Sequence, residues 1–242
     1  MTSPNPILHE PRLTNERKLI ASASRAERAI QLLDQLLLPD GDYPENTIHS
    51  IYYETRSLRS FAEKVDGDNL KHKVRLRWYR DNRGAAESNE IPAFLEVKFR
   101  IGSARHKIRQ KLSLTRQWLA SAPLTDPALG DVLRMANAEL GAWMSDSRIP
   151  AIHISYQRCR YRCPYTEGRV AVDRNIRVHR FHPDLFPFGA PFSIADTVCE
   201  YKDAAQVEIP WLRHLYDAGF RMRSYSKFGE AIRILSLGGA PA

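Results

Sequence analysis

The sequence predicts an α+β protein in which a curved or closed antiparallel sheet makes up most of the structure. Segments of alternating apolar and polar residues recur along the chain, and basic residues concentrate in those segments. The chain has 242 residues, of which 43% are hydrophobic and 26% charged, so it can bury a sizeable core. We expect a single domain over residues 1–242, with flexible ends at 1–12 and 238–242.

Helical periodicity is confined to four segments. The first, residues 24–38, begins with a Ser-x-x-Glu capping box and ends before a Pro-Asp-Gly stop. The second, residues 127–144, has Asp126 as its expected N-cap and proline at its first helical position. Residues 211–218 and 227–237 are predicted as two shorter helices.

The remaining apolar segments alternate with period two and are predicted as antiparallel strands. They cover residues 48–55, 71–80, 93–100, 106–114, 152–161, 168–181 and 196–203. Residues 81–92 are expected to form a loop between two strands.

Positive charge gathers in two of these regions. The whole chain has 36 Lys and Arg against 28 Asp and Glu, a net charge of +8. Residues 71–111 contain twelve basic and four acidic side chains, and residues 158–180 contain seven arginines and two acidic side chains. Arginine in this number favours a phosphate partner, because its planar fork binds oxyanions bidentately.

The basic residues also share one phase of the strands. Arg75 and Arg77 point to one side of their strand, and Val74 and Leu76 to the other. Like charges across a ladder repel, so a merely solvated face would intersperse other residues. The pattern therefore favours a polar interior that surrounds a polyanion.

Several function classes are disfavoured. No apolar run approaches the roughly 20 residues of a membrane span, and no signal peptide is evident, so we expect a cytoplasmic protein. Cys159, Cys163 and Cys199 lack the spacing of a zinc site and are expected to pack in the core. His153 has the phase opposite to Arg158 and is expected to point outward or to pack. A nucleic-acid module is disfavoured because most arginines share a face with each other rather than with aromatic residues.

The order and spacing of nine short motifs carry a family resemblance that spans residues 15–237. The motifs are Glu16-Arg17-Lys18, residues 50–55 (SIYYET), residues 73–79 (KVRLRWY), residues 94–98 (FLEVK), Lys107-Ile108-Arg109, Tyr156-Gln157-Arg158, residues 169–173 (RVAVD), Glu200-Tyr201-Lys202 and Ser226-Lys227-Phe228. Together they resemble the VTC-type polyphosphate polymerase domain of the CYTH, or triphosphate tunnel metalloenzyme, superfamily.

This resemblance implies a closed eight-stranded antiparallel barrel with flanking helices and a basic interior tunnel. It implies a metal-dependent transferase that moves the γ-phosphate of ATP to a growing inorganic polyphosphate chain, with Mn²⁺ or Mg²⁺ as cofactor. The implied catalytic residues are Arg75, Arg77, Lys98, Lys107, Arg158, Arg169 and Lys227. Substrate contacts are expected from Lys18, Arg109, Lys202 and Arg160.

Glu200 matches the metal-binding glutamate of the family. Glu96 and Glu16 either bind the metal as well or only orient arginines. Thr14 breaks the ExExK signature of the hydrolytic members, which favours the polymerase branch. Two alternatives stay open: a triphosphatase or polyphosphatase, and a catalytically silent polyphosphate-binding module. We expect neither an upstream sensing domain nor a membrane anchor, so attachment to a membrane and product export would need a partner. The oligomeric state is left open.

Overall fold

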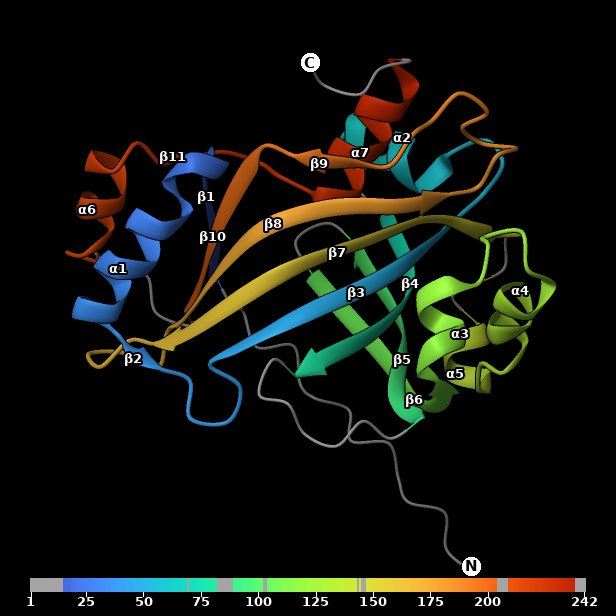
Figure 1. Ribbon diagram of the computed structural model, residues 1–242, viewed down its shortest axis with the longest axis horizontal. Helices are drawn as coiled ribbons and strands as arrows, with labels where there is room; N and C mark the ends of the chain where they lie inside the picture. The colour runs from blue at the N-terminus through green and yellow to red at the C-terminus, as the bar shows by residue number, and fades with distance from the viewer. Residues whose placement is uncertain are drawn as a thin grey trace, which may run out of the picture.

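The computed structural model describes residues 15–68, 70–81, 89–101, 104–142, 144, 147–203 and 209–237. Its centre is one eleven-stranded antiparallel sheet with the order β11-β1-β10-β8-β7-β3-β4-β5-β6, in which β2 pairs with β7 and β9 with β8 (Figure 1). The strands are β1 (Asn15–Ser22), β2 (Leu38–Pro39), β3 (Glu45–Glu54), β4 (Leu70–Asp81), β5 (Glu90–Ile101), β6 (Ala104–Thr115), β7 (Ile149–Arg162), β8 (Arg169–Phe181), β9 (Phe192–Ile194), β10 (Asp196–Asp203) and β11 (Arg221–Met222).

The sheet is strongly curved. Strands β1 and β4 are five steps apart in the strand order, which is about 24 Å in a flat sheet. Yet Lys18 on β1 donates to the Tyr225 carbonyl, and Lys73 on β4 donates to the hydroxyl of the next residue, Ser226. One short segment can reach both strands only because the sheet bends around it. The side of the sheet that faces this segment is called the inner face below.

Helices cover the outer face in two groups (Figure 1). Helices α1 (Ala26–Leu36) and α6 (Leu212–Asp217) pack on β1, β10, β8 and β7 through a cluster that contains all three cysteines. Helices α3 (Arg116–Ser121), α4 (Pro127–Arg134) and α5 (Ala138–Gly141) pack on β3, β4 and β5. The cysteines are buried and unpaired, and burial raises the pKa of the Cys159 thiol to about 11, which confirms them as packing residues.

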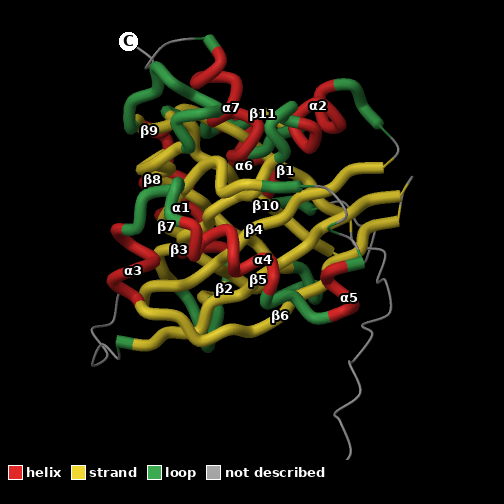
Figure 2. The backbone as a smooth tube through the Cα atoms, turned by 90° about the vertical axis from the view of Figure 1, so that its right-hand side faces the viewer, coloured by secondary structure: helices red, strands yellow, loops and turns green. Residues whose placement is uncertain are grey.

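Helix α7 (Lys227–Ser236) covers part of the inner face instead. Its Phe228, Ala231 and Ile232 belong to one cluster with buried apolar residues of six strands, including Ile152 and Val198. Helix α2 (Arg59–Val65) lies beside it, and the two helices stay together in both views (Figures 1 and 2). One end of the inner face is therefore apolar and covered, and the charged residues lie on the rest.

The expected closed eight-stranded barrel is wrong in two respects. The sheet has eleven strands, and within the described residues no pairing joins β6 to β1 or β11. The two-residue strand β11 pairs with part of β1 at one edge, and at the other edge the Gln110 side chain of β6 hydrogen-bonds the Met135 carbonyl and the Asn137 amide at the turn between α4 and α5.

The helix predictions hold with shifted boundaries. The expected capping box at residues 24–27 is wrong: Arg25 is the N-cap of α1, a 3-10 turn (Ala23–Arg25) precedes it, and Ser24 hydrogen-bonds Ser22. Asp126 caps α4 as expected, but that helix ends at Arg134 because Asn137 starts a new cap for α5. Helices α2 and α3 and the three shortest strands were not predicted, since segments this short show too little periodicity. Strand β1 was not predicted from alternation either, and only the family motif Glu16-Arg17-Lys18 pointed to it.

All seven predicted strands are present, and they extend by one to three residues at most ends. The loop expected at 81–92 lies largely outside the described residues, and β5 already begins at Glu90. Residues 1–12 and 238–242 also lie outside them. In the part of the chain that the structure describes, no helix combines the length and apolar character needed to cross a membrane.

Candidate functional site

A buried glutamate organises the basic residues of β4, β5 and β6. Cross-strand register places Arg75, Glu96 and Arg109 side by side on the inner face. Arg75 binds one oxygen of Glu96 through two nitrogens, at 2.7 Å from Nε and 2.6 Å from Nη2. Lys107 Nζ lies 2.7 Å from the other oxygen, and Arg109 Nε lies 3.6 Å from it. These four residues form the Glu96 cluster.

Electrostatics fix the charges of this cluster. Burial alone would raise the pKa of Glu96, but the charges of Arg75, Arg77 and Lys107 outweigh it and lower this pKa strongly. The side chain of Glu96 has no exposed surface, whereas the side chains of Lys107 and Arg109 are 42% and 39% exposed. Glu96 therefore orients three cations, two of which keep donors accessible to a ligand.

A buried aspartate plays the corresponding part on the other side of the inner face. Arg158 on β7 binds Asp173 on β8 bidentately, at 2.5 and 2.7 Å, and Lys227 of α7 reaches the same carboxylate at 2.5 Å. Burial raises the pKa of Asp173, but the charges of Arg158 and Lys227 outweigh it and lower this pKa. These three residues form the Asp173 cluster, which fastens the start of α7 to the sheet.

Sequence reasoning quoted Asp173 in a motif but gave it no role. A signal was present: Asp173 is one of only two acidic residues among the seven arginines of residues 158–180, and it shares the phase of Arg169. The structure pairs it directly with Arg158 across the β7–β8 ladder.

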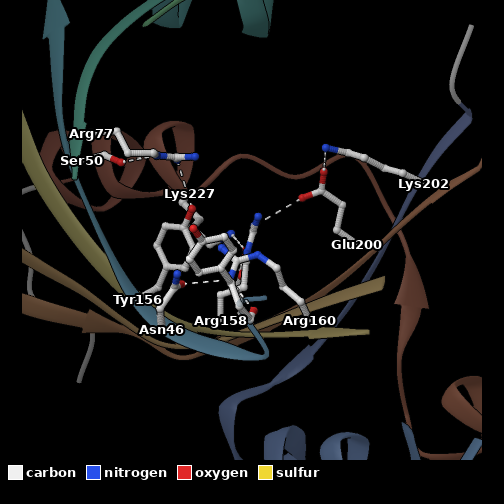
Figure 3. Close-up of polar contacts among 11 residues, drawn as sticks. Asn46, Ser50, Arg77, Tyr156, Arg158, Arg160, Glu200, Lys202 and Lys227 are labelled. Atoms are coloured by element: carbon white, nitrogen blue, oxygen red, sulfur yellow. Dashed lines mark hydrogen bonds and ion pairs between the residues drawn. The ribbon is translucent and has the colours of Figure 1, made fainter. Parts of the chain in front are cut away.

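Glu200 lies beside the Asp173 cluster, on the inner face of β10. One oxygen lies 2.7 Å from Lys202 Nζ and the other 3.6 Å from Arg158 Nη2 (Figure 3). Lys18 is its direct cross-strand neighbour on β1, and Lys18 also pairs with Glu16 at 2.8 Å. Burial opposes ionisation of Glu200, but Lys202, Arg158 and Lys18 hold its pKa well below the usual range. Glu200 is thus an ionised carboxylate surrounded by cations.

Tyr156 connects the two sides of the site. Its hydroxyl accepts a hydrogen bond from Arg77 at 3.1 Å, while Arg77 also donates to Ser50 (Figure 3). The cation of Lys227 lies 4.5 Å from the centre of the Tyr156 ring, and that of Arg158 lies 5.4 Å away. Such cation–π contacts hold charged groups in place without neutralising them.

The phase argument against aromatic residues on the basic face is wrong for two tyrosines. Tyr156 and Tyr79 occupy inner-face positions, two residues from Arg158 and Arg77 respectively. Trp78 and Tyr161 do belong to the outer-face clusters. His153 packs on the outer side as expected, buried against Trp78 and His49.

The other expected site residues lie around this centre. Lys98 lies on the inner face with part of its side chain in solvent, and the charges of Arg75 and Lys202 hold its pKa well below 10.5. Arg160 is held by the Tyr43 carbonyl and the Asn46 side chain, both at 3.1 Å. Arg169 is exposed at the start of β8, across the ladder from Lys202, and is farther from both clusters along the sheet.

No group of three or more His, Cys, Asp or Glu suited to a metal ion occurs within the described residues. Each inner-face carboxylate named above is instead paired with Lys or Arg. The arrangement presents fixed cations from at least six strands and one helix to a shared space. Chemically, it can neutralise a multiply charged anion along its length.

Fold and site define an α+β protein with a curved antiparallel sheet and a cationic inner face. The sequence profile of the VTC domain matches residues 13–236, nearly the whole chain. The chain therefore belongs to the VTC domain family.

Comparison with solved structures gives only distant likenesses. A candidate adenylate cyclase from Vibrio parahaemolyticus is 13% identical, with a TM-score of 0.43 over 90% of this chain and 97% of that one. A candidate adenylate cyclase from Bacillus halodurans is 16% identical, with a TM-score of 0.40 over 94% and 91%. The Mediator head module of Schizosaccharomyces pombe gives 11% identity and a TM-score of 0.41 over 87% and 98%. No curated protein matches the chain significantly.

Proposed function

We propose that this protein is a metal-dependent phosphotransferase that moves the γ-phosphate of ATP to a growing inorganic polyphosphate chain. The observation that carries the proposal is the pair of cation clusters on one inner face, each pre-organised by a buried carboxylate. Membership of the VTC family supports it. ATP and polyphosphate are both linear polyanions, so one cationic space can accept either.

The chemistry suits these residue types. Phosphoryl transfer needs in-line positioning and neutralisation of the equatorial oxygens more than it needs a covalent protein group. Arg75 and Arg158 are locked by bidentate or double contacts, so they need little reorganisation when charge develops on the phosphate. Lys227 and Lys107 add compact charges from opposite sides of the site.

A divalent metal, Mn²⁺ or Mg²⁺, fits Glu200 better than Glu96. Glu200 is ionised, and its side chain is 13% exposed, whereas Glu96 is fully enclosed by its cations. We therefore assign the metal to Glu200 and the orientation of arginines to Glu96, with Glu16 as the next candidate ligand. One carboxylate is enough, because such metals keep water and phosphate oxygens in their shell. When bound, the metal would neutralise charge on the phosphate oxygens.

The direct test is incubation of the purified protein with ATP and Mn²⁺, with the products resolved on a gel. Long polyphosphate is the expected product. Orthophosphate alone would overturn the proposal in favour of the hydrolase, and no turnover despite tight binding of ATP would favour a binding module.

Removing the metal carboxylate gives a second test. Glu200→Gln should abolish Mn²⁺-dependent turnover while the affinity for tripolyphosphate stays within severalfold of wild type, because the cations remain. Glu16→Gln, on the neighbouring strand, is the matched control and should keep most activity. If Glu200→Gln turns over like wild type, Glu200 does not hold the metal.

A further inference from the structure

Two aromatic rings lie in an unexpected place on the inner face. Tyr79 on β4 and Phe94 on β5 are both half-buried, and their ring centres are 6.0 Å apart in an edge-to-face arrangement. Cross-strand register places Phe94 directly beside Arg77, and Tyr79 follows Arg77 by two residues on the same face. The rings therefore continue the row of phosphate-binding candidates toward the end of the sheet where β4 stops.

Arg109 joins the rings to the cations. Its guanidinium carbon lies 3.4 Å from the centre of the Phe94 ring, while its Nε lies 3.6 Å from Glu96 in the neighbouring row. From Tyr79 to Arg75 the strand spans four residues, about 14 Å. That distance is comparable to an extended nucleoside triphosphate, measured from its base to its terminal phosphate.

The chemistry of the rings does not match a polyphosphate chain. A linear phosphate polymer presents only oxyanions, and these gain nothing from half-buried aromatic surface. A nucleobase does gain, because its flat ring stacks on aromatic faces and on arginine planes. The inner face thus offers an aromatic part next to a cationic part, in the order in which a nucleotide carries its base and its phosphates.

We propose that Tyr79, Phe94 and Arg109 form the nucleobase subsite of a purine nucleoside triphosphate whose phosphates lie toward Arg77, Arg75 and the Glu96 cluster. This inference rests on the proposed function. It adds two statements to that function, namely where the nucleobase binds and which bases are preferred. Stacking depends on ring area, so the subsite favours ATP and GTP over CTP and UTP and discriminates little between the two purines.

The competing explanation is that Phe94 only positions Arg109 against the phosphates. The two explanations differ in which ligands respond to loss of the ring. A base subsite affects only ligands that carry a base, whereas a misplaced Arg109 affects every polyanion, including inorganic tripolyphosphate.

The test measures dissociation constants of the full-length protein for ATP, CTP and tripolyphosphate by titration calorimetry, for wild type, Phe94→Leu, Tyr79→Leu and Tyr79→Phe. Phe94→Leu should raise the dissociation constant for ATP at least about fivefold, as expected for loss of base stacking. The same variant should change the dissociation constant for tripolyphosphate less than about twofold. The preference of wild type for ATP over CTP should shrink in the same variant. Tyr79→Phe keeps the ring and should therefore lose much less affinity for ATP than Tyr79→Leu, and thermal melts confirm that each variant is folded.

If Phe94→Leu weakens the binding of ATP and of tripolyphosphate equally, the proposed base subsite is overturned and Phe94 only supports Arg109. An unchanged ATP constant in both Phe94→Leu and Tyr79→Leu would overturn it as well. Wild-type protein that binds neither ATP nor tripolyphosphate would instead overturn the proposed function, so the two failures are distinguishable.

Discussion

The Glu96 cluster and the Asp173 cluster both hold cations in place on the inner face, but they are built from different parts of the chain. Both hold arginine and lysine around one fully buried carboxylate. The Glu96 cluster comes from three consecutive strands, β4 to β6, whose register alone sets the cations side by side. The Asp173 cluster needs β7, β8 and a helix that follows 54 residues after Asp173. The first is a property of local pairing, and the second a property of the tertiary fold.

The largest expected effect breaks the Asp173 cluster. Asp173→Asn leaves Lys227 without its carboxylate and Arg158 with only the more distant Glu200, which should lower the free energy of unfolding by about 3–5 kcal/mol at neutral pH. Its lowered folded-state pKa means that this stabilisation is present above the ordinary pKa of 3.8 and is lost as the pH falls through the folded value. The difference from wild type should therefore shrink in acid, as followed by denaturant unfolding at several pH values.

Tripolyphosphate supplies the control for this variant. An added polyanion should compensate the two cations and raise the melting temperature of Asp173→Asn more than that of wild type. A variant as stable as wild type without ligand would contradict the assigned role of Asp173.

The next effect compares one lysine from each cluster. Lys227→Ala should lower the rate of ATP turnover by about a hundredfold or more at saturating Mn²⁺, as for loss of other charge-stabilising groups. Lys107→Ala should lower it only about tenfold, because that side chain is 42% exposed and acts through a higher dielectric. Lys227→Arg should restore activity in part, since a planar fork does not replace a compact ammonium. A Lys227→Ala rate within twofold of wild type would remove this residue from the site.

The smallest effect concerns Lys98, whose pKa lies well below 10.5 because Arg75 and Lys202 repel its proton. Loss of that proton removes a positive charge, so affinity for tripolyphosphate should fall as the pH rises through the lowered value. Lys98→Arg stays charged over this range and should show a shallower, severalfold smaller decline. Titration calorimetry at a series of pH values below 10.5 measures this decline, and parallel pH profiles for the two proteins would refute the assigned role of Lys98.

The two clusters also mark how far sequence reasoning reaches. Alternation is local, so the strands and the shared face of Arg75, Arg77, Lys107 and Arg109 were predictable from residue order alone. The partner of Arg158 was not, because Asp173 becomes its neighbour only through the register of the β7–β8 ladder. Lys227 was predicted as a site residue only from the family resemblance, because a single lysine at the start of a helix gives no signal of its own.

The edges of the sheet were unpredictable for a similar reason. Closure depends on whether β6 meets β1 or β11, which is a contact between the two ends of the strand order. The short strand β11 at one end and the Gln110 contact with the α4–α5 turn at the other were equally unpredicted. Neither feature leaves a pattern in the sequence. The aromatic residues of the inner face could have been predicted, since Tyr79 and Tyr156 are in phase with neighbouring arginines.

The position of Lys227 in the last described helix also sets an order of assembly. Residues 70–115 contain the whole Glu96 cluster and can bring it together while the rest of the chain is still being synthesised. Asp173 remains without its lysine until residue 227 has left the ribosome, and the apolar patch that Phe228 and Ile232 cover stays open to solvent for the same interval. A nascent chain thus carries the other inner-face cations without Lys227, next to an uncovered apolar surface, until its final helix docks.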